Sequence, residues 1–247
     1  MMQFDRRLLQ HFDWVMLLML LLVSAMALMN LYSSTHSADT GASTIFIKQL
    51  TFFAAGMVLV LVLMTQEYQR VVKVGYVLYV VVLLLLLYTL FFVKSIAGAQ
   101  RWIDLGFFSL QPSEPAKLIL ILVFAHTYAS VEVPGGYRLR DLIRPIVLTA
   151  IPFVLILVQP DLGTALICAI IFVSMTLFVR LRWTTLGILA GAGLACAFIG
   201  WKFLLKDYQR KRIETFLNPE GDPMNHGYQI MQSKIAVGSG EIFGKGF

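Results

Sequence analysis

The sequence predicts an all-α fold, a polytopic membrane helix bundle of about seven transmembrane helices. Of the 247 residues, 58% are hydrophobic and only 14% are charged, whereas soluble domains have about 45–50% apolar and about 25% charged residues. The apolar residues also form continuous runs, most of them close to the roughly 20 residues that a helix needs to cross a bilayer. These runs do not alternate with polar residues as the strands of a membrane barrel do, which argues against a barrel.

The predicted spans occupy residues 1–205, and residues 206–247 are expected to begin a large loop outside the membrane. The first run is too long for a signal peptide and has no small-residue cleavage site, so it is expected to remain as a helix. The fourth and fifth runs are short, which leaves their ends poorly defined. The seven runs are Trp14–Tyr32, Ile45–Thr65, Val74–Val93, Pro115–Ser130, Ile143–Val158, Leu162–Val179 and Thr185–Leu205.

Lysine and arginine are distributed unequally between the loops that connect these runs. The positive-inside rule places the basic loops in the cytoplasm, so the N-terminus is predicted to be cytoplasmic. The net charge of +6 is then mostly a topology signal, and no nucleic-acid partner is predicted. The basic loops contain Arg6, Arg7, Arg70, Lys73, Arg138, Arg140, Arg144, Arg180 and Arg182, and the short opposite loops contain only Lys94 and Arg101.

With this topology, the rare polar residues converge on the outer face of the membrane. Three segments reach that face: the stretch 98–120, the turn 159–161 and everything from Lys206 onward. In the first segment, Glu114 and Lys117 are spaced i, i+3 and can meet on one helix surface. We predict a buried ion pair that faces a polar cavity, because ionisable groups inside spans usually face a cavity. A helix start with a snorkelling lysine is the alternative.

The local sequence also assigns helix ends near these residues. Ser113 is expected to cap the helix that contains the pair, with Pro115 in its first turn. Asp161 is expected to cap the sixth span, and its carboxylate could also receive a sugar hydroxyl or a divalent cation. The two cysteines lie inside predicted spans, which implies no disulfide framework, and the four histidines lack metal-ligand spacing, so no metal site is predicted.

Three long motifs carry a resemblance to a known family. "GAQRWIDLGFFSLQPSEPAK", "QPDLGT" and "NPEGDPMNHGYQIMQSKIAVGSG" resemble the motifs of the SEDS proteins (shape, elongation, division and sporulation), which are polytopic cell-wall polymerases of bacteria. The motifs occur in the family's order and at its spacing, and the resemblance runs from the first span to Phe247. Within the family, "DYQRKR" and "GKGF" are more similar to the elongation branch than to the division branch.

The resemblance implies a peptidoglycan glycosyltransferase of the bacterial cytoplasmic membrane. Such an enzyme extends glycan strands from lipid II by an inverting transfer and releases undecaprenyl pyrophosphate. No cofactor is implied, and a divalent cation is left open. The resemblance implies catalytic roles for Glu114, Lys117 and Asp161, with Lys117 and Arg101 against the pyrophosphate. It implies substrate contacts for Arg101, Trp102, Gln111, Ser113 and Lys234.

The family also implies partners and a longer chain. Its members work with a class B penicillin-binding protein, a transpeptidase, and the elongation branch works with an actin-like filament system. The family continues past the last motif into an acidic segment and about three more helices, about ten in all, and the Asp usually regarded as its base lies there. This chain is therefore expected to be either a piece of a longer product or inactive alone. The alternatives are a lipid-precursor transporter (flippase) that uses the same cavity and a non-catalytic scaffold for a transpeptidase.

Overall fold

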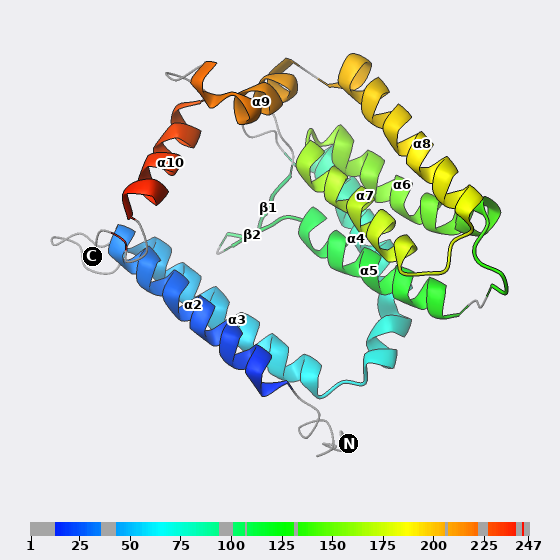
Figure 1. Cartoon of the computed structure of the whole chain (residues 1–247). Helices are drawn as coiled ribbons and strands as arrows, with labels where there is room; N and C mark the ends of the chain where they lie inside the picture. The colour runs from blue at the N-terminus through cyan, green and yellow to red at the C-terminus, as the bar shows by residue number, and fades with distance from the viewer. Residues whose placement is uncertain are drawn as a thin grey trace. The chain divides into compact units, whose positions relative to one another are not determined.

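The structure, a computed structural model, describes residues 13–35, 43–93, 101–106, 108–130, 133–205, 207–221, 227–240 and 244. The chain divides into two compact units, residues 1–185 and 186–247 (Figure 1). The described residues are overwhelmingly helical, with one pair of two-residue strands. The predicted all-α membrane bundle is confirmed.

Each of the seven predicted spans is a helix in the structure. Most observed ends lie within a few residues of the predicted ones, but α4 begins at Tyr68 instead of Val74. The apolar run marks only the part of a helix that suits lipid, whereas backbone hydrogen bonding continues through the polar turn before it. The helices are α2 Trp14–Thr35, α3 Thr44–Met64, α4 Tyr68–Phe92, α5 Ser113–Ala129, α6 Ile143–Val158, α7 Leu162–Leu177 and α8 Trp183–Ile199.

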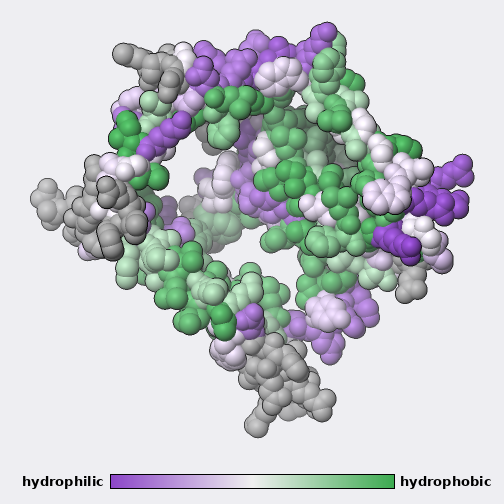
Figure 2. All heavy atoms as spheres, in the orientation of Figure 1, coloured by the Kyte–Doolittle hydropathy of each residue, from purple (hydrophilic) through white to green (hydrophobic). Residues whose placement is uncertain are grey.

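Five of the described helices are long and apolar enough to cross a membrane. They are α2, α3, α4, α8 with the π-helical turn that follows it, and α6 with the 3₁₀ turn Leu139–Leu142 that precedes it. The helix α7 is apolar but shorter, at 16 residues. No residue of α2 or α3 is buried, and their surface is largely apolar (Figure 2). Helices that are apolar all round, in a small chain, are typical of membrane spans, so this is a multi-pass membrane protein.

The packed core of the first unit lies between α4, α5, α6 and α7. Helix α5 contributes most to it, with Leu120, Val123 and Phe124 fully buried against Leu86 of α4 and Ile156 of α6. Helices α4 and α5 approach closely at Gly75. A Cβ atom at this position would lie only 3.3 Å from the Cβ of Leu122 in α5. Small residues at such contacts are a common device of membrane helices.

Hydrogen bonds at one end of this bundle show that the four helices alternate in direction. The Tyr76 hydroxyl near the start of α4 lies 2.6 Å from Thr127 Oγ1 near the end of α5, and Arg144 at the start of α6 donates to Tyr76 at 3.0 Å. Tyr128 of α5 and Thr176 of α7 join the two helix ends at 2.7 Å. The ends of α4 and α6 and the starts of α5 and α7 therefore share the opposite end.

A buried tyrosine compensates for the proline inside α6. Pro152 has no backbone N–H, so the carbonyl of Leu148, four residues earlier, lacks its helical donor. The hydroxyl of Tyr79 in α4 donates to this carbonyl at 2.8 Å. The bond ties α4 to α6 at the point where the helix ladder is interrupted.

We expect Tyr79→Phe to lower the free energy of unfolding by about 1–2 kcal/mol, because a carbonyl inside the bundle loses its donor. In a Pro152→Ala background the same change should cost much less, since the new N–H at position 152 can bond Leu148. Tyr88→Phe on the exposed side of α4 is the matched control. Denaturation in mixed detergent micelles measures these differences. Equal losses in both backgrounds would contradict the assignment.

In the described part of the second unit, two short helices follow α8. A π-helical turn, Gly200–Leu204, extends α8, and then follow α9 Asp207–Leu217, a 3₁₀ turn Pro219–Gly221 and α10 Tyr228–Gly240. Both α9 and α10 lie in residues 206–247, which were expected to begin a large loop. Asp207 in the first turn of α9 suits the helix dipole and stands four residues before Lys211, which favours a helix. The division into a membrane bundle, residues 1–205, and a loop outside the membrane, residues 206–247, stays a prediction.

Candidate functional site

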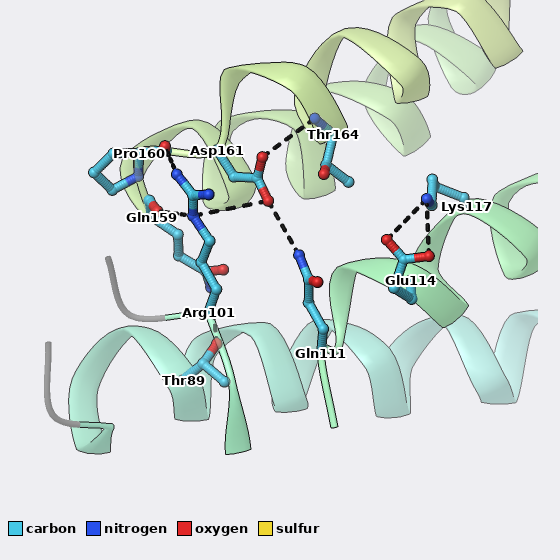
Figure 3. Close-up of polar contacts among 9 residues, drawn as sticks. All are labelled: Thr89, Arg101, Gln111, Glu114, Lys117, Gln159, Pro160, Asp161 and Thr164. Atoms are coloured by element: carbon cyan, nitrogen blue, oxygen red, sulfur yellow. Dashed lines mark hydrogen bonds and ion pairs between the residues drawn. The ribbon is translucent and has the colours of Figure 1, made fainter. Parts of the chain in front are cut away.

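Five of the predicted site residues lie together at one end of the α4–α7 bundle. A hairpin of two short antiparallel strands, β1 Ile103–Asp104 and β2 Ser109–Leu110, connects α4 to α5 on this side. Figure 3 shows Arg101 just before the hairpin, Gln111 just after it, and both directed at the turn between α6 and α7. Glu114 and Lys117 project from the first turns of α5 beside them.

Asp161 accepts two hydrogen bonds and faces one guanidinium. Its Oδ1 accepts from the backbone N of Thr164 at 3.3 Å, which confirms the predicted cap of α7. Its Oδ2 accepts from Gln111 Nε2 at 3.1 Å and lies 3.8 Å from Arg101 Nε. The side chain is only 12% exposed. A carboxylate has about four acceptor positions, so Asp161 is fixed in direction while part of its acceptor capacity remains.

Arg101 is directed at the turn before Asp161. Its Nε donates to the carbonyl of Gln159 at 3.2 Å, and a second guanidinium nitrogen donates to the carbonyl of Pro160. The side chain is 30% exposed. Its contacts in this structure hold the turn, so the structure supports a positioning role more directly than the predicted contact with pyrophosphate.

Glu114 and Lys117 form the predicted ion pair, but the pair is not buried. Lys117 Nζ donates to both carboxylate oxygens of Glu114 at 3.0 Å, as the i, i+3 spacing predicts. Lys117 is 21% exposed, whereas Glu114 is 57% exposed. The prediction of a buried pair is therefore wrong for Glu114. Its neighbours Ser113 and Ala116 in the same turn of α5 are buried, so Glu114 lies on the exposed side of that turn, and only Lys117, nearly one turn further along, is largely covered.

The remaining predicted residues are placed differently. Ser113 does not cap α5: it is the first helical residue and buried, Pro112 precedes it as the N-cap, and no side chain caps this end. Trp102 is half exposed at the base of the hairpin. Lys234 is exposed on α10, in the second unit. Contacts of Ser113, Trp102 and Lys234 with substrate stay predictions.

The structure adds two residues that were not among the predicted site residues, although Gln159 begins the motif QPDLGT. Gln159 and Thr89 are buried, and they bond to each other beneath the turn that carries Asp161. Among the described residues no three His, Cys, Asp or Glu side chains could hold a metal ion. The divalent cation stays untested.

The comparisons with known proteins assign the chain to a family. The family model for FtsW, RodA and SpoVE, described as "cell cycle protein", matches residues 10–247. The chain belongs to this family. The match covers the predicted spans and all the site residues described above, so the predicted resemblance is confirmed.

Named relatives and solved structures agree with this assignment. The Escherichia coli K12 peptidoglycan glycosyltransferase MrdB is 36% identical over 241 residues, 96% of this chain and 62% of that protein. The Helicobacter pylori 26695 protein of the same name is 34% identical, covering 99% of this chain and 61% of that protein. The chain thus spans about three fifths of the length of these relatives.

Two solved structures share the fold. A chain of a peptidoglycan synthase complex that coordinates polymerization and crosslinking matches with a TM-score of 0.72 and 34% identity over 94% of this chain and 67% of that one. The crystal structure of Thermus thermophilus RodA, a rod shape determining protein, matches with a TM-score of 0.60 and 30% identity over 74% of this chain and 60% of that one.

Proposed function

We propose that this protein is a peptidoglycan glycosyltransferase that joins lipid-linked disaccharide units into glycan strands. One observation supports the proposal most: a fixed carboxylate, Asp161, and a largely covered cation, Lys117, share one end of the bundle. Relatives of the same family from Escherichia coli and Helicobacter pylori bear the name of this activity. Glycosyl transfer from a pyrophosphate-linked donor needs both kinds of group.

The reaction forms a bond from an acceptor hydroxyl oxygen to the donor's anomeric carbon and breaks the bond from that carbon to pyrophosphate. The leaving pyrophosphate gains negative charge, which a fixed cation stabilises. We assign this role to Lys117. Glu114 holds the ammonium in place before substrate binds, and its exposed carboxylate can turn to water when Lys117 turns to phosphate.

The acceptor hydroxyl has to be oriented, and its proton has to pass to a base. We assign the orientation of the acceptor to Asp161. Gln111 and Arg101 direct the Oδ2 side of its carboxylate, and the helix cap directs the other side. The identity of the base stays a prediction from family resemblance. A side chain held from three directions loses little entropy when a ligand binds to it.

The experiment is polymerisation of lipid II by the protein purified from its whole gene in detergent. Glycan products longer than the disaccharide, separated on a gel, are the expected result. A protein that makes no polymer but moves the lipid-linked precursor across a vesicle membrane would contradict the proposal and favour the transporter alternative.

We further propose that the site end of the bundle faces outward from the cytoplasmic membrane. The support is the charge of the loops: those at the opposite end carry Arg138, Arg140, Arg180 and Arg182, whereas the loops at the site end carry only Lys94 and Arg101, and basic loops stay in the cytoplasm. In a variant without native cysteines, we expect a membrane-impermeant thiol reagent to label Gly106→Cys in intact cells, and to label Arg140→Cys only after permeabilisation. The reverse pattern would overturn this orientation.

A transpeptidase partner is part of the proposal. The matching peptidoglycan synthase complex combines polymerization with crosslinking, and crosslinking is the work of a penicillin-binding protein. We propose that this protein pairs with one of class B. The actin-like filament system stays a prediction from family resemblance.

A further inference from the structure

Gln159 is a buried polar residue at the end of α6, two positions before Asp161. Its side chain is 2% exposed. The amide Nε2 donates to the carbonyl of Leu86 at 2.9 Å and to Thr89 Oγ1 at 2.8 Å, both near the end of α4. Burying an amide in an apolar bundle is costly unless it is hydrogen-bonded, so these two bonds fix where the side chain lies.

The backbone of the same residue belongs to the site. Its N–H donates to the carbonyl of Ile156 at 3.1 Å and closes the last turn of α6. Its carbonyl accepts from Arg101 Nε at 3.2 Å, and this same nitrogen lies 3.8 Å from Asp161 Oδ2. Figure 3 shows the resulting order, from Thr89 through Gln159 and Arg101 to Asp161.

From this arrangement we propose that Gln159 is a positioning residue for the glycosyl transfer proposed above, on which this inference rests. Its side chain docks the turn between α6 and α7 onto α4. The docked turn determines where Asp161 lies relative to Gln111. It also determines where the carbonyls of Gln159 and Pro160 lie relative to the guanidinium of Arg101. Without the dock, the turn is held less firmly, so the cap that Asp161 forms with the N–H of Thr164 opens more often and the carboxylate shifts relative to Lys117.

A displacement of about 1 Å at a reacting group costs on the order of 100-fold in rate. In the protein expressed from its whole gene, we expect Gln159→Leu and Thr89→Val to lower kcat for lipid II polymerisation by about 10- to 100-fold with little change in KM. Thr89→Ser, which keeps the hydroxyl, should recover most of kcat. The matched control is Thr176→Val, which removes a buried interhelix hydroxyl bond at the opposite end of the bundle and should leave kcat unchanged.

Coupling to Asp161 separates positioning from a general structural role. In an Asp161→Asn background, Gln159→Leu should cause less than about a threefold further loss, because residues that act through one another are not additive. A loss of the same factor in both backgrounds would overturn the inference, and so would a Gln159→Leu enzyme with normal kcat.

Amide hydrogen exchange tests the dock without using activity. Gln159→Leu should speed exchange at Thr164, whose N–H is bonded to Asp161, and leave exchange at the Tyr128 end of the bundle unchanged. If the wild-type protein makes no glycan, the proposed function fails, yet faster exchange at Thr164 still shows the dock. If exchange at Thr164 is unchanged, the dock itself is wrong.

Discussion

We expect Lys117→Met to abolish glycan polymerisation and to leave the amount of folded protein in the membrane almost unchanged. Activity should fall without a loss of stability because the partner of Lys117, Glu114, is exposed to solvent. A buried pair that loses one partner costs about 3–5 kcal/mol, but an exposed pair contributes about 0–1 kcal/mol, and Glu114 is exposed. The variant therefore keeps its fold and loses the cation that faces the pyrophosphate, for which we expect a loss of at least about 100-fold.

The variants of Glu114 refine this expectation. Glu114→Gln keeps an oxygen that can accept from Lys117, so we expect activity to fall by only about tenfold. The double variant Glu114→Gln with Lys117→Met carries neither charge of the pair, so no charge is left without a partner. It should still be inactive because it lacks the cation that faces pyrophosphate. Lys48→Met, at an exposed lysine near the start of α3, is the matched control and should polymerise lipid II normally. If the double variant polymerises normally, the pair is structural and the assignment of Lys117 to pyrophosphate is wrong.

The positions of the helices could be predicted because bilayer thickness sets the length of an apolar run. Runs in the sequence therefore located α2 to α8 within a few residues, apart from the polar start of α4 and the end of α8, where a π-helical turn completes the predicted run. The hairpin between α4 and α5 was not predicted, since two residues per strand give no alternation to detect. Helix α9 was missed because its residues are mostly polar, and hydropathy was the signal used.

The candidate site was predictable where it depends on local spacing. Glu114 and Lys117 meet because they lie three residues apart on a helix, and Asp161 caps because of its place before Gly163 and Thr164. The burial of Glu114 could not be judged, since it depends on which side of α5 packs against the neighbouring helices.

Contacts between segments distant in sequence could not be predicted from the sequence alone. Gln111 reaches Asp161 across 50 residues, and Gln159 reaches Thr89 across 70. Topology predicted that the first pair shares one membrane face, but a single sequence holds no signal for which side chains touch there. Gln159 begins the motif QPDLGT, but neither its burial nor its contact with Thr89 could be predicted from the sequence.

Asp161→Asn is expected to fold normally and to lose most of its activity. Asn caps helices about as well as Asp, and its amide oxygen can still accept from one of the donors that surround the carboxylate. The charge that Arg101 faces at 3.8 Å is lost, however, and so is the strong acceptor for a sugar hydroxyl. We expect kcat for lipid II polymerisation to fall by about 100-fold or more, with thermal stability in detergent within a few degrees of the wild type.

The matched control for this change is Asp141→Asn at the opposite end of the bundle. Asp141 also accepts from a backbone N–H three residues away in sequence, that of Arg138 at 2.8 Å, and it is exposed. The two substitutions remove the same charge from similar local turns, so they share any cost of weakened capping. They differ in what surrounds the carboxylate: only Asp161 also faces Gln111 and Arg101. Loss of activity at position 161 alone would assign the effect to that site, whereas normal activity in both variants would reduce Asp161 to a helix cap.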